Sequence, residues 1–353
     1  MMRALMTYAA TIAVMLLTAQ AASAAGLFPK VVVTVAPLKP YVDEILAGHG
    51  EAQNLLRPGQ DAHSFALTLP QAKMLDEADV IIVPDLAMSP FLARILASKK
   101  KLHVVELTAL NGAYPLPYAS DNPWLEAAKK AAEKKAATKH GHADEHADAD
   151  EHDDHNEHDE HDHAGAGRGV TDPHLWLDPE RMAAIAVPLA REIATHAPEA
   201  RGALIANANL LASHLRNEVI PQLAAMLSKP STTKSAVARP EIPFITYHAA
   251  YQYFLARFNL THYGEITKRP EEAMGAKTIA GILSGAENLH IRCLIGEQKN
   301  VLIVNIAKSS GAKIVIISPE QIPPRAEVDA LDWIKNDYDR LLYVTAKAFS
   351  KCL

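Results

Sequence analysis

The residues Asp172-Pro-His-Leu-Trp-Leu-Asp-Pro179 form a short connection between two halves of the chain that share one pattern. Proline fixes its own φ and disfavours the α region for the residue before it, so the two Asp-Pro pairs stiffen this segment. Asp178 before Pro179 is also typical of a helix start, with an acidic N-cap and proline at the first helical position. His174 is therefore held rigidly, as a metal-binding imidazole needs to be.

Strand-like and helix-like patterns alternate on both sides of this connection, which indicates parallel sheets covered by helices. The strand-like runs lie at 31–35, 54–56, 80–83 and 104–107 before it, and at 244–247, 263–266, 292–295 and 313–317 after it. Apolar residues at helical spacing, with proline kinks, follow the connection directly. We therefore predict an α/β fold of two parallel-sheet lobes joined by a long rigid helix. The expected boundaries are a signal peptide at 1–24, an N-terminal lobe at 25–178, connecting helices at 179–230 and a C-terminal lobe at 231–353.

The N-terminal residues predict export. Arg3, an apolar run from Ala9 to Leu17 and the small residues Ala22-Ser-Ala24 are typical of a cleavable signal peptide, and the apolar run is too short to span a membrane. No lipid-attachment site follows. A net charge of -6 without a basic, aromatic-studded face gives no support for nucleic-acid binding. We expect an exported, soluble monomer without a lipid anchor.

The chain has two cysteines, Cys293 and Cys352, which in an oxidising compartment suggest one disulfide. Two buried thiols are the alternative, since sequence does not fix connectivity. Zinc ligation by the pair is less favoured, because neither cysteine lies in a CxxC motif.

A segment rich in histidine and acid interrupts the N-terminal half at about 122–169. Residues 140–163 hold eight histidines, eleven acids and no apolar residue larger than alanine, so this segment cannot bury enough surface to offset the entropy of ordering. We expect it to be disordered without metal and to bind several zinc ions weakly. These auxiliary ligands are His140, His142, His146, His152, His155, His158, His161 and His163.

Three further histidines follow a predicted strand or precede a predicted helix. They are His63, His174 and His248, and they come from both lobes and from the connection between them. Ligands lie beyond the carboxyl ends of parallel strands, so we expect these side chains to converge in an interlobe cleft. Imidazole suits zinc, copper, nickel and iron. Six other histidines carry no such signal and are interpreted as ordinary polar residues: His49, His103, His196, His214, His262 and His290.

The chain resembles the substrate-binding proteins of ABC transporters that carry zinc or manganese, most closely the periplasmic zinc-binding ZnuA type. The resemblance covers nearly the whole mature chain. The motifs that carry it are Pro58-Gly-Gln-Asp-Ala-His63, Glu77-Ala-Asp-Val80, Asp172 to Pro179, Tyr247-His-Ala-Ala-Tyr-Gln-Tyr-Phe254, the acidic histidine-rich insert and the cysteine pair.

This resemblance implies that His63, His174 and His248 bind Zn²⁺. It favours zinc because manganese-binding relatives have a carboxylate at the position of His248. The family's late aspartate has no clear match between Pro323 and Asp332. The fourth ligand therefore stays open between water and a carboxylate, with Glu327 and Asp329 as candidates.

The implied function is capture of periplasmic Zn²⁺ and its delivery to an inner-membrane ABC permease, without turnover. A zinc buffer acting through the insert is one alternative. A zinc hydrolase is less favoured, because no H-E-x-x-H motif or similar base lies near the ligands.

Overall fold

The computed structural model describes residues 28–98, 102–118, 171–228, 244–269, 274–325 and 331–353. The predicted signal peptide at 1–24 and the histidine-rich insert lie outside the described residues. Within those ranges, no helix combines the length and the apolar character that a membrane crossing requires.

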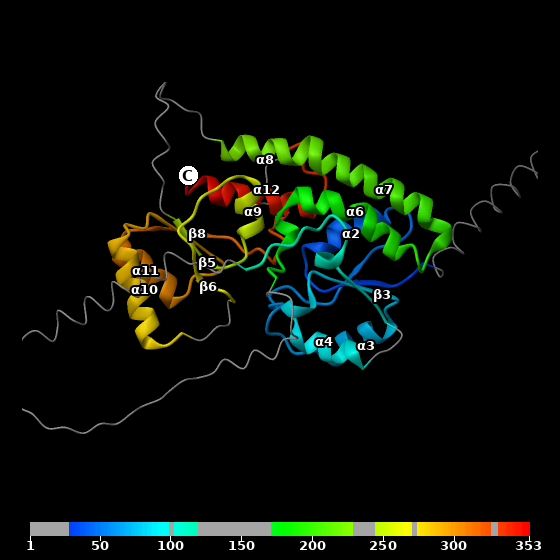
Figure 1. Cartoon of the computed structure of the whole chain (residues 1–353), viewed down its shortest axis with the longest axis horizontal. Helices are drawn as coiled ribbons and strands as arrows, with labels where there is room; N and C mark the ends of the chain where they lie inside the picture. The colour runs from blue at the N-terminus through cyan, green and yellow to red at the C-terminus, as the bar shows by residue number, and fades with distance from the viewer. Residues whose placement is uncertain (1–27, 99–101, 119–170, 229–243, 270–273, 326–330) are drawn as a thin grey trace, which may run out of the picture.

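Two four-stranded parallel sheets form the two lobes (Figure 1). The first has the order β2-β1-β3-β4 and the second the order β6-β5-β7-β8, so both follow one topology. In each sheet, the strand that comes first in the chain lies between the second and the third strands. The chain therefore adds one neighbour on one side of this strand and then crosses over to add the next on the other side. The strands of the first sheet are β1 (Val31–Val33), β2 (Gln53–Asn54), β3 (Val80–Val83) and β4 (His103–Glu106). Those of the second are β5 (Phe244–His248), β6 (Glu265–Thr267), β7 (Cys293–Gly296) and β8 (Lys313–Ile316).

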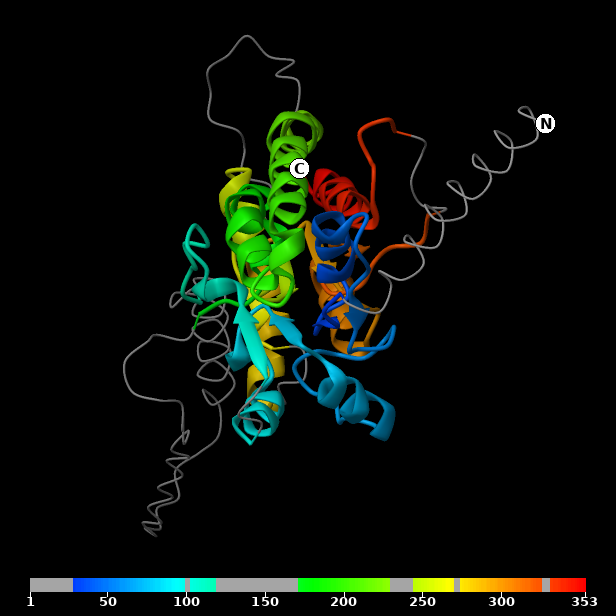
Figure 2. The same cartoon turned by 90° about the vertical axis from the view of Figure 1, so that its right-hand side faces the viewer.

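Helices cover both faces of each sheet. The helices of the described residues are α2 (Leu38–Leu46), α3 (Leu69–Glu77), α4 (Pro90–Ala97), α6 (Pro179–Ile193), α7 (Arg201–His214), α8 (Ile220–Leu227), α9 (Gln252–Arg257), α10 (Ala276–Asn288), α11 (Val301–Ser310) and α12 (Asp337–Ser350). Figure 2, which looks along the long axis, shows α3 and α4 on the far side of the first sheet from α2. The predicted two-lobe α/β fold is confirmed.

Strand alternation explains why buried apolar runs suit this arrangement. Val31 and Val33 pack into the large core that includes α2, α6 and α7, whereas Val32 packs with α3 and α4. In the second sheet, Phe244 belongs to the same large core and Ile245 packs with α10 and α11. Successive side chains of a strand point to opposite faces, so a strand covered on both sides is apolar throughout. One continuous core therefore spans both lobes.

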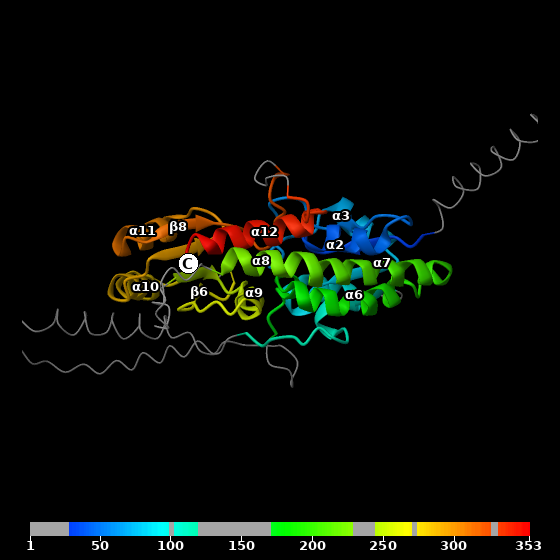
Figure 3. The same ribbon diagram turned by 90° about the horizontal axis from the view of Figure 1, so that it is seen from above.

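A nearly continuous helical rod crosses the molecule over both lobes (Figures 1 and 3). It consists of α7, a π-helical turn at Leu215–Val219 and α8. Pro221 lies in the first turn of α8, where it lacks an N–H and its ring crowds the carbonyl of the preceding turn. The π turn accommodates the proline, and the rod stays helical through it. The helix is therefore locally widened here, where a kink was predicted. Figure 3 shows α12 running beside the rod.

A disulfide closes the second lobe. It joins Cys293 at the start of β7 to Cys352 just beyond α12, with Cα atoms 5.6 Å apart. The final helix is thereby tied to β7, one of the two central strands of its own sheet.

Candidate metal centre

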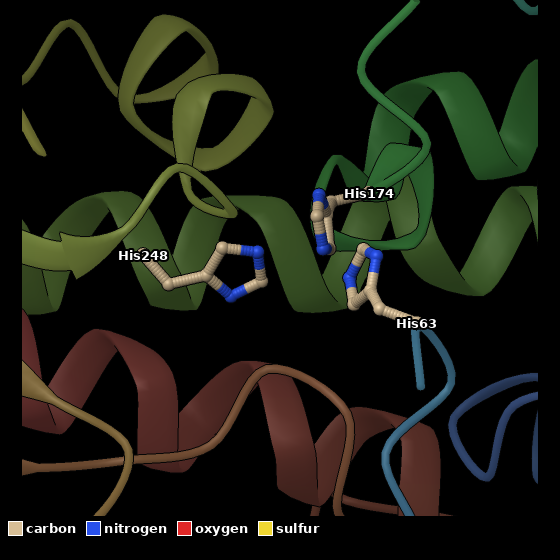
Figure 4. Close-up of side chains that lie close together, drawn as sticks. All are labelled: His63, His174 and His248. Carbon is tan, nitrogen blue, oxygen red and sulfur yellow. The ribbon is translucent and has the colours of Figure 1, made fainter. Parts of the chain in front are cut away.

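Three histidines from distant parts of the sequence converge between the lobes (Figure 4). His63 lies in the loop between β2 and α3, His174 directly precedes the short 3-10 helix Leu175–Leu177, and His248 ends β5. The ring centroids are 5.6 Å apart for His63 and His174, 5.4 Å for His63 and His248, and 4.8 Å for His174 and His248. One nitrogen from each ring lies within 4.8 Å of the others, which is close enough to share one cation.

Asp172 fixes the orientation of His174. Its Oδ1 accepts a hydrogen bond from the backbone N–H of His174 at 2.9 Å and faces Nδ1 of the same residue at 2.7 Å. The carboxylate therefore favours the tautomer with the proton on Nδ1, and Nε2 is left with a lone pair. Nε2 of His174 is buried and has no hydrogen-bond partner among the described residues. This carboxylate–imidazole pair is the arrangement that supports metal-binding histidines.

Glu297 does the same for His248. It follows β7 directly, and its Oε1 lies 2.6 Å from Nδ1 of His248. Nε2 of His248 is likewise buried without a partner in the described part of the chain. The residue before Glu297 is Gly296, where an added Cβ would come within 2.5 Å of the buried side chain of Ile303. Glycine here lets the end of β7 pack closely and present the carboxylate to the site.

Glu320 of the second lobe lies beside His63. Its Oε1 lies 3.3 Å from Nε2 of His63, and its Oε2 accepts a hydrogen bond from the backbone N–H of Ala62 at 3.2 Å. Asp61, which accepts from the backbone N–H of His63 at 2.8 Å, lies in the same cluster. Because Glu320 follows β8 in the second lobe, its contacts join the two lobes at the site.

Aromatic side chains hold the His174 segment against the second lobe. The indole N–H of Trp176 donates to the carbonyl of Pro319 at 2.8 Å, next to Glu320. The hydroxyl of Tyr253 on α9 donates to the carbonyl of Asp172 at 2.8 Å. At the other end of the segment, Asp178 caps α6 as predicted. Positions of the candidate ligands therefore depend on packing across both lobes.

Burial and charge favour the unprotonated form of His174. Burial lowers its pKa well below the usual value, and charge on His248 and His63 would lower it further. For Glu320, burial alone would raise the pKa, but the hydrogen bond from His63 and the charges of His63 and His174 lower it overall. Burial thus keeps His174 unprotonated, which is the form in which an imidazole binds a cation.

The three histidines that converge were predicted from the sequence, whereas Glu320 and Glu297 were not. Both follow the carboxyl end of a strand in the second sheet, the same signal that identified His248. The suggested fourth ligands Glu327 and Asp329, and all eight insert histidines, lie outside the described residues.

Comparison with known proteins identifies the family. The family model described as "Zinc-uptake complex component A periplasmic", ZnuA, matches residues 31–344. The chain belongs to this family. A curated ZnuA relative, the high-affinity zinc uptake system protein of Brucella abortus (strain 2308), is 28% identical over 300 residues, which cover 84% of this chain and 85% of the relative.

Solved structures share the ZnuA fold. A structure of ZnuA has a TM-score of 0.64 at 18% identity, and the match covers 92% of this chain and 99% of that structure's chain. The solute-binding protein FpvC of Pseudomonas aeruginosa, solved with Mn²⁺, has a TM-score of 0.65 at 18% identity, covering 92% and 98%. The ZnuA family and these neighbours are solute-binding proteins, not enzymes.

Proposed function

We propose that this protein captures Zn²⁺ in the periplasm, after export by the signal peptide at 1–24, and delivers it to an inner-membrane ABC permease. Membership of the zinc-uptake family and the two-lobe solute-binding fold support this function. The ion is the transported cargo, so the site has to bind it and release it without changing it.

The proposed ligands are His63, His174 and His248, with Glu320 as the fourth. The observation that carries the proposal is the pair of carboxylates behind two of the rings, at 2.7 Å and 2.6 Å from Nδ1, which leaves each buried Nε2 facing the same point. Each ring is thus oriented before the ion arrives, and its basicity is increased. Without a cation, these buried nitrogens would cost free energy.

The ligand chemistry favours zinc. Three imidazoles and one carboxylate match the tetrahedral coordination that Zn²⁺ takes in proteins, whereas Mg²⁺, Ca²⁺ and Mn²⁺ favour sites richer in oxygen. A fourth protein ligand would also leave no position for a reactive water, which fits binding without catalysis.

Substitution of His174 by alanine tests the proposal. We expect the variant to lose tight Zn²⁺ binding, measured by competition with a chromophoric chelator, and to fail to support growth of a deletion strain in zinc-limited medium. His49→Ala is the matched control, because His49 is exposed and lies away from the cluster. Retention of tight binding and of growth by the His174 variant would show that the three-histidine site is not the functional one.

The insert is proposed to raise the local zinc concentration through weak binding by its eight histidines. Deletion of residues 140–163 should remove extra weak sites in titration calorimetry and leave one tight site. Loss of the tight site instead would favour the buffer function, in which the insert itself holds the metal.

A further inference from the structure

A second group of imidazoles lies at the far end of α6 from His174. His103 is the first residue of β4, and His196 lies just beyond the C-terminal end of α6. Because the strands are parallel, their N-terminal ends lie on one side of the sheet and their C-terminal ends on the other. His103 starts β4, whereas the loop that carries His63 follows the C-terminal end of β2, so the two lie on opposite sides. With 15 residues, α6 is roughly 22 Å long, so the two groups of histidines are well separated.

The two rings face each other through one nitrogen each. Nδ1 of His103 lies 3.1 Å from Nε2 of His196, and the rings are stacked with centroids 5.2 Å apart. On its other side, Nε2 of His103 lies 3.3 Å from a carboxylate oxygen of Glu192, which is on the last turn of α6. When Nε2 of His103 donates to this carboxylate, Nδ1 has a lone pair directed at His196.

The carboxylate of Glu192 thus lies behind His103 at 3.3 Å, a longer contact than the 2.7 Å and 2.6 Å of the carboxylates behind His174 and His248. We propose that His103 and His196 form a second, surface metal-binding site for Zn²⁺, with Glu192 orienting His103. Two nitrogens bound to a tetrahedral zinc at about 2.0–2.1 Å are about 3.3 Å apart, close to the separation of these two atoms. On binding, the proton that His196 carries on Nε2 moves through solvent to its own Nδ1, so both facing nitrogens become ligands and both rings stay neutral.

The charges around the pair favour a cation. The C-terminus of α6 carries partial negative charge from its last carbonyl groups, and Glu192 adds a full negative charge. Arg191 on the same turn offsets part of this field. The side chains of His103 and Glu192 are 28% and 43% exposed, so water completes the coordination. With two protein ligands on the surface, the pair binds more weakly than the buried three-histidine cluster and fills after it.

Residue-specific chemical labelling tests this site in the full mature chain. Carbethoxylation by diethyl pyrocarbonate, quantified for each histidine peptide by mass spectrometry, is measured while Zn²⁺ is added beyond the first equivalent. We expect His103 and His196 to lose reactivity together, at one midpoint. The exposed His49 and His290 should keep theirs. If His103 and His196 stay reactive up to millimolar zinc, the proposal is wrong.

Three variants test the roles of Glu192 and His196 and show whether the surface site is independent of the three-histidine site. Glu192→Gln should raise the zinc midpoint about 10-fold, the lower end of the effect of such orienting carboxylates, and His196→Ala should abolish the protection of His103. An unchanged midpoint in the first variant, or surviving protection in the second, would overturn the proposed geometry. His174→Ala should leave the midpoint unchanged, because the surface site does not depend on the transport site. Loss of protection in that variant would contradict an independent second site.

Discussion

Replacement of Asp172 by asparagine tests whether the carboxylate behind His174 sets the affinity of the metal centre. Asp172 is fully buried, and its Oδ1 contacts both the backbone N–H and Nδ1 of His174. Asparagine keeps the shape of the side chain and an oxygen in place of Oδ1. It removes the negative charge that stabilises the imidazole once Nε2 binds a cation.

The structure predicts different effects on the metal-free and zinc-bound protein. Burial raises the pKa of Asp172 to about 8, so the negative charge itself adds little stability to the metal-free protein. The free energy of unfolding without metal should therefore change little. In the zinc-bound protein the carboxylate orients and polarises a ligand, and loss of such a partner typically reduces metal affinity by about 10- to 100-fold. That range corresponds to about 1.4 to 2.7 kcal/mol.

Chelator competition gives the zinc affinity of each variant, and thermal unfolding with and without zinc gives the stability. Asp339→Asn is the matched control, since Asp339 is also fully buried and its Oδ2 lies 2.8 Å from Nε2 of His214, outside the metal centre. We expect the Asp339 variant to lose stability and keep its zinc affinity. The Asp172 variant should keep its stability without metal and lose zinc affinity. Zinc affinity within two-fold of the unaltered protein for the Asp172 variant would refute the reasoning.

Further predictions concern the stability of the fold. The hydrogen bond that His214 donates to the carboxylate of Asp339 on α12 raises the pKa of His214 above the usual value. The stability that this bond contributes is therefore complete below about pH 6.5 and is lost as pH rises through the folded-state pKa. His214→Gln should therefore lower the free energy of unfolding more at about pH 5.5 than at about pH 9; an equal loss at both would contradict this. Cys352→Ser opens the bond to Cys293, 59 residues away, and should cost about 4 kcal/mol in urea unfolding. An unchanged midpoint would mean that the disulfide does not constrain the unfolded chain. Trp176→Phe leaves the carbonyl of Pro319 without its buried donor and should cost about 1 to 3 kcal/mol. Calorimetric unfolding measures this loss, and a stability equal to that of the unaltered protein would argue against that bond.

The fold was predictable because local and long-range signals agree. Val80–Val83 is fully buried between two layers of helices, and its apolar run predicted a strand with the same limits. The helix start at Asp178 and Pro179 was predictable from capping chemistry alone. The π turn before Pro221 was not, because whether a proline breaks, bends or widens a helix depends on the neighbours packed against that helix.

Part of the site was predictable for a similar reason. His248 ends a strand, and parallel topology brings such positions together. Glu320 follows the last strand of the same sheet, but its role depends on the carbonyl of Pro319 meeting Trp176, a contact between residues far apart in sequence. The pairing of His103 with His196 has the same origin, since a strand start and a helix end meet only when the first lobe is folded.

The most direct test of the central claim is a crystal structure of the mature protein with one equivalent of zinc, with anomalous differences measured at the zinc edge. We predict one strong peak between the lobes, about 2.0–2.1 Å from Nε2 of His174 and of His248 and also bound by His63 and Glu320. A strong peak elsewhere, with none among these three histidines, would contradict the claim that they hold the transported ion.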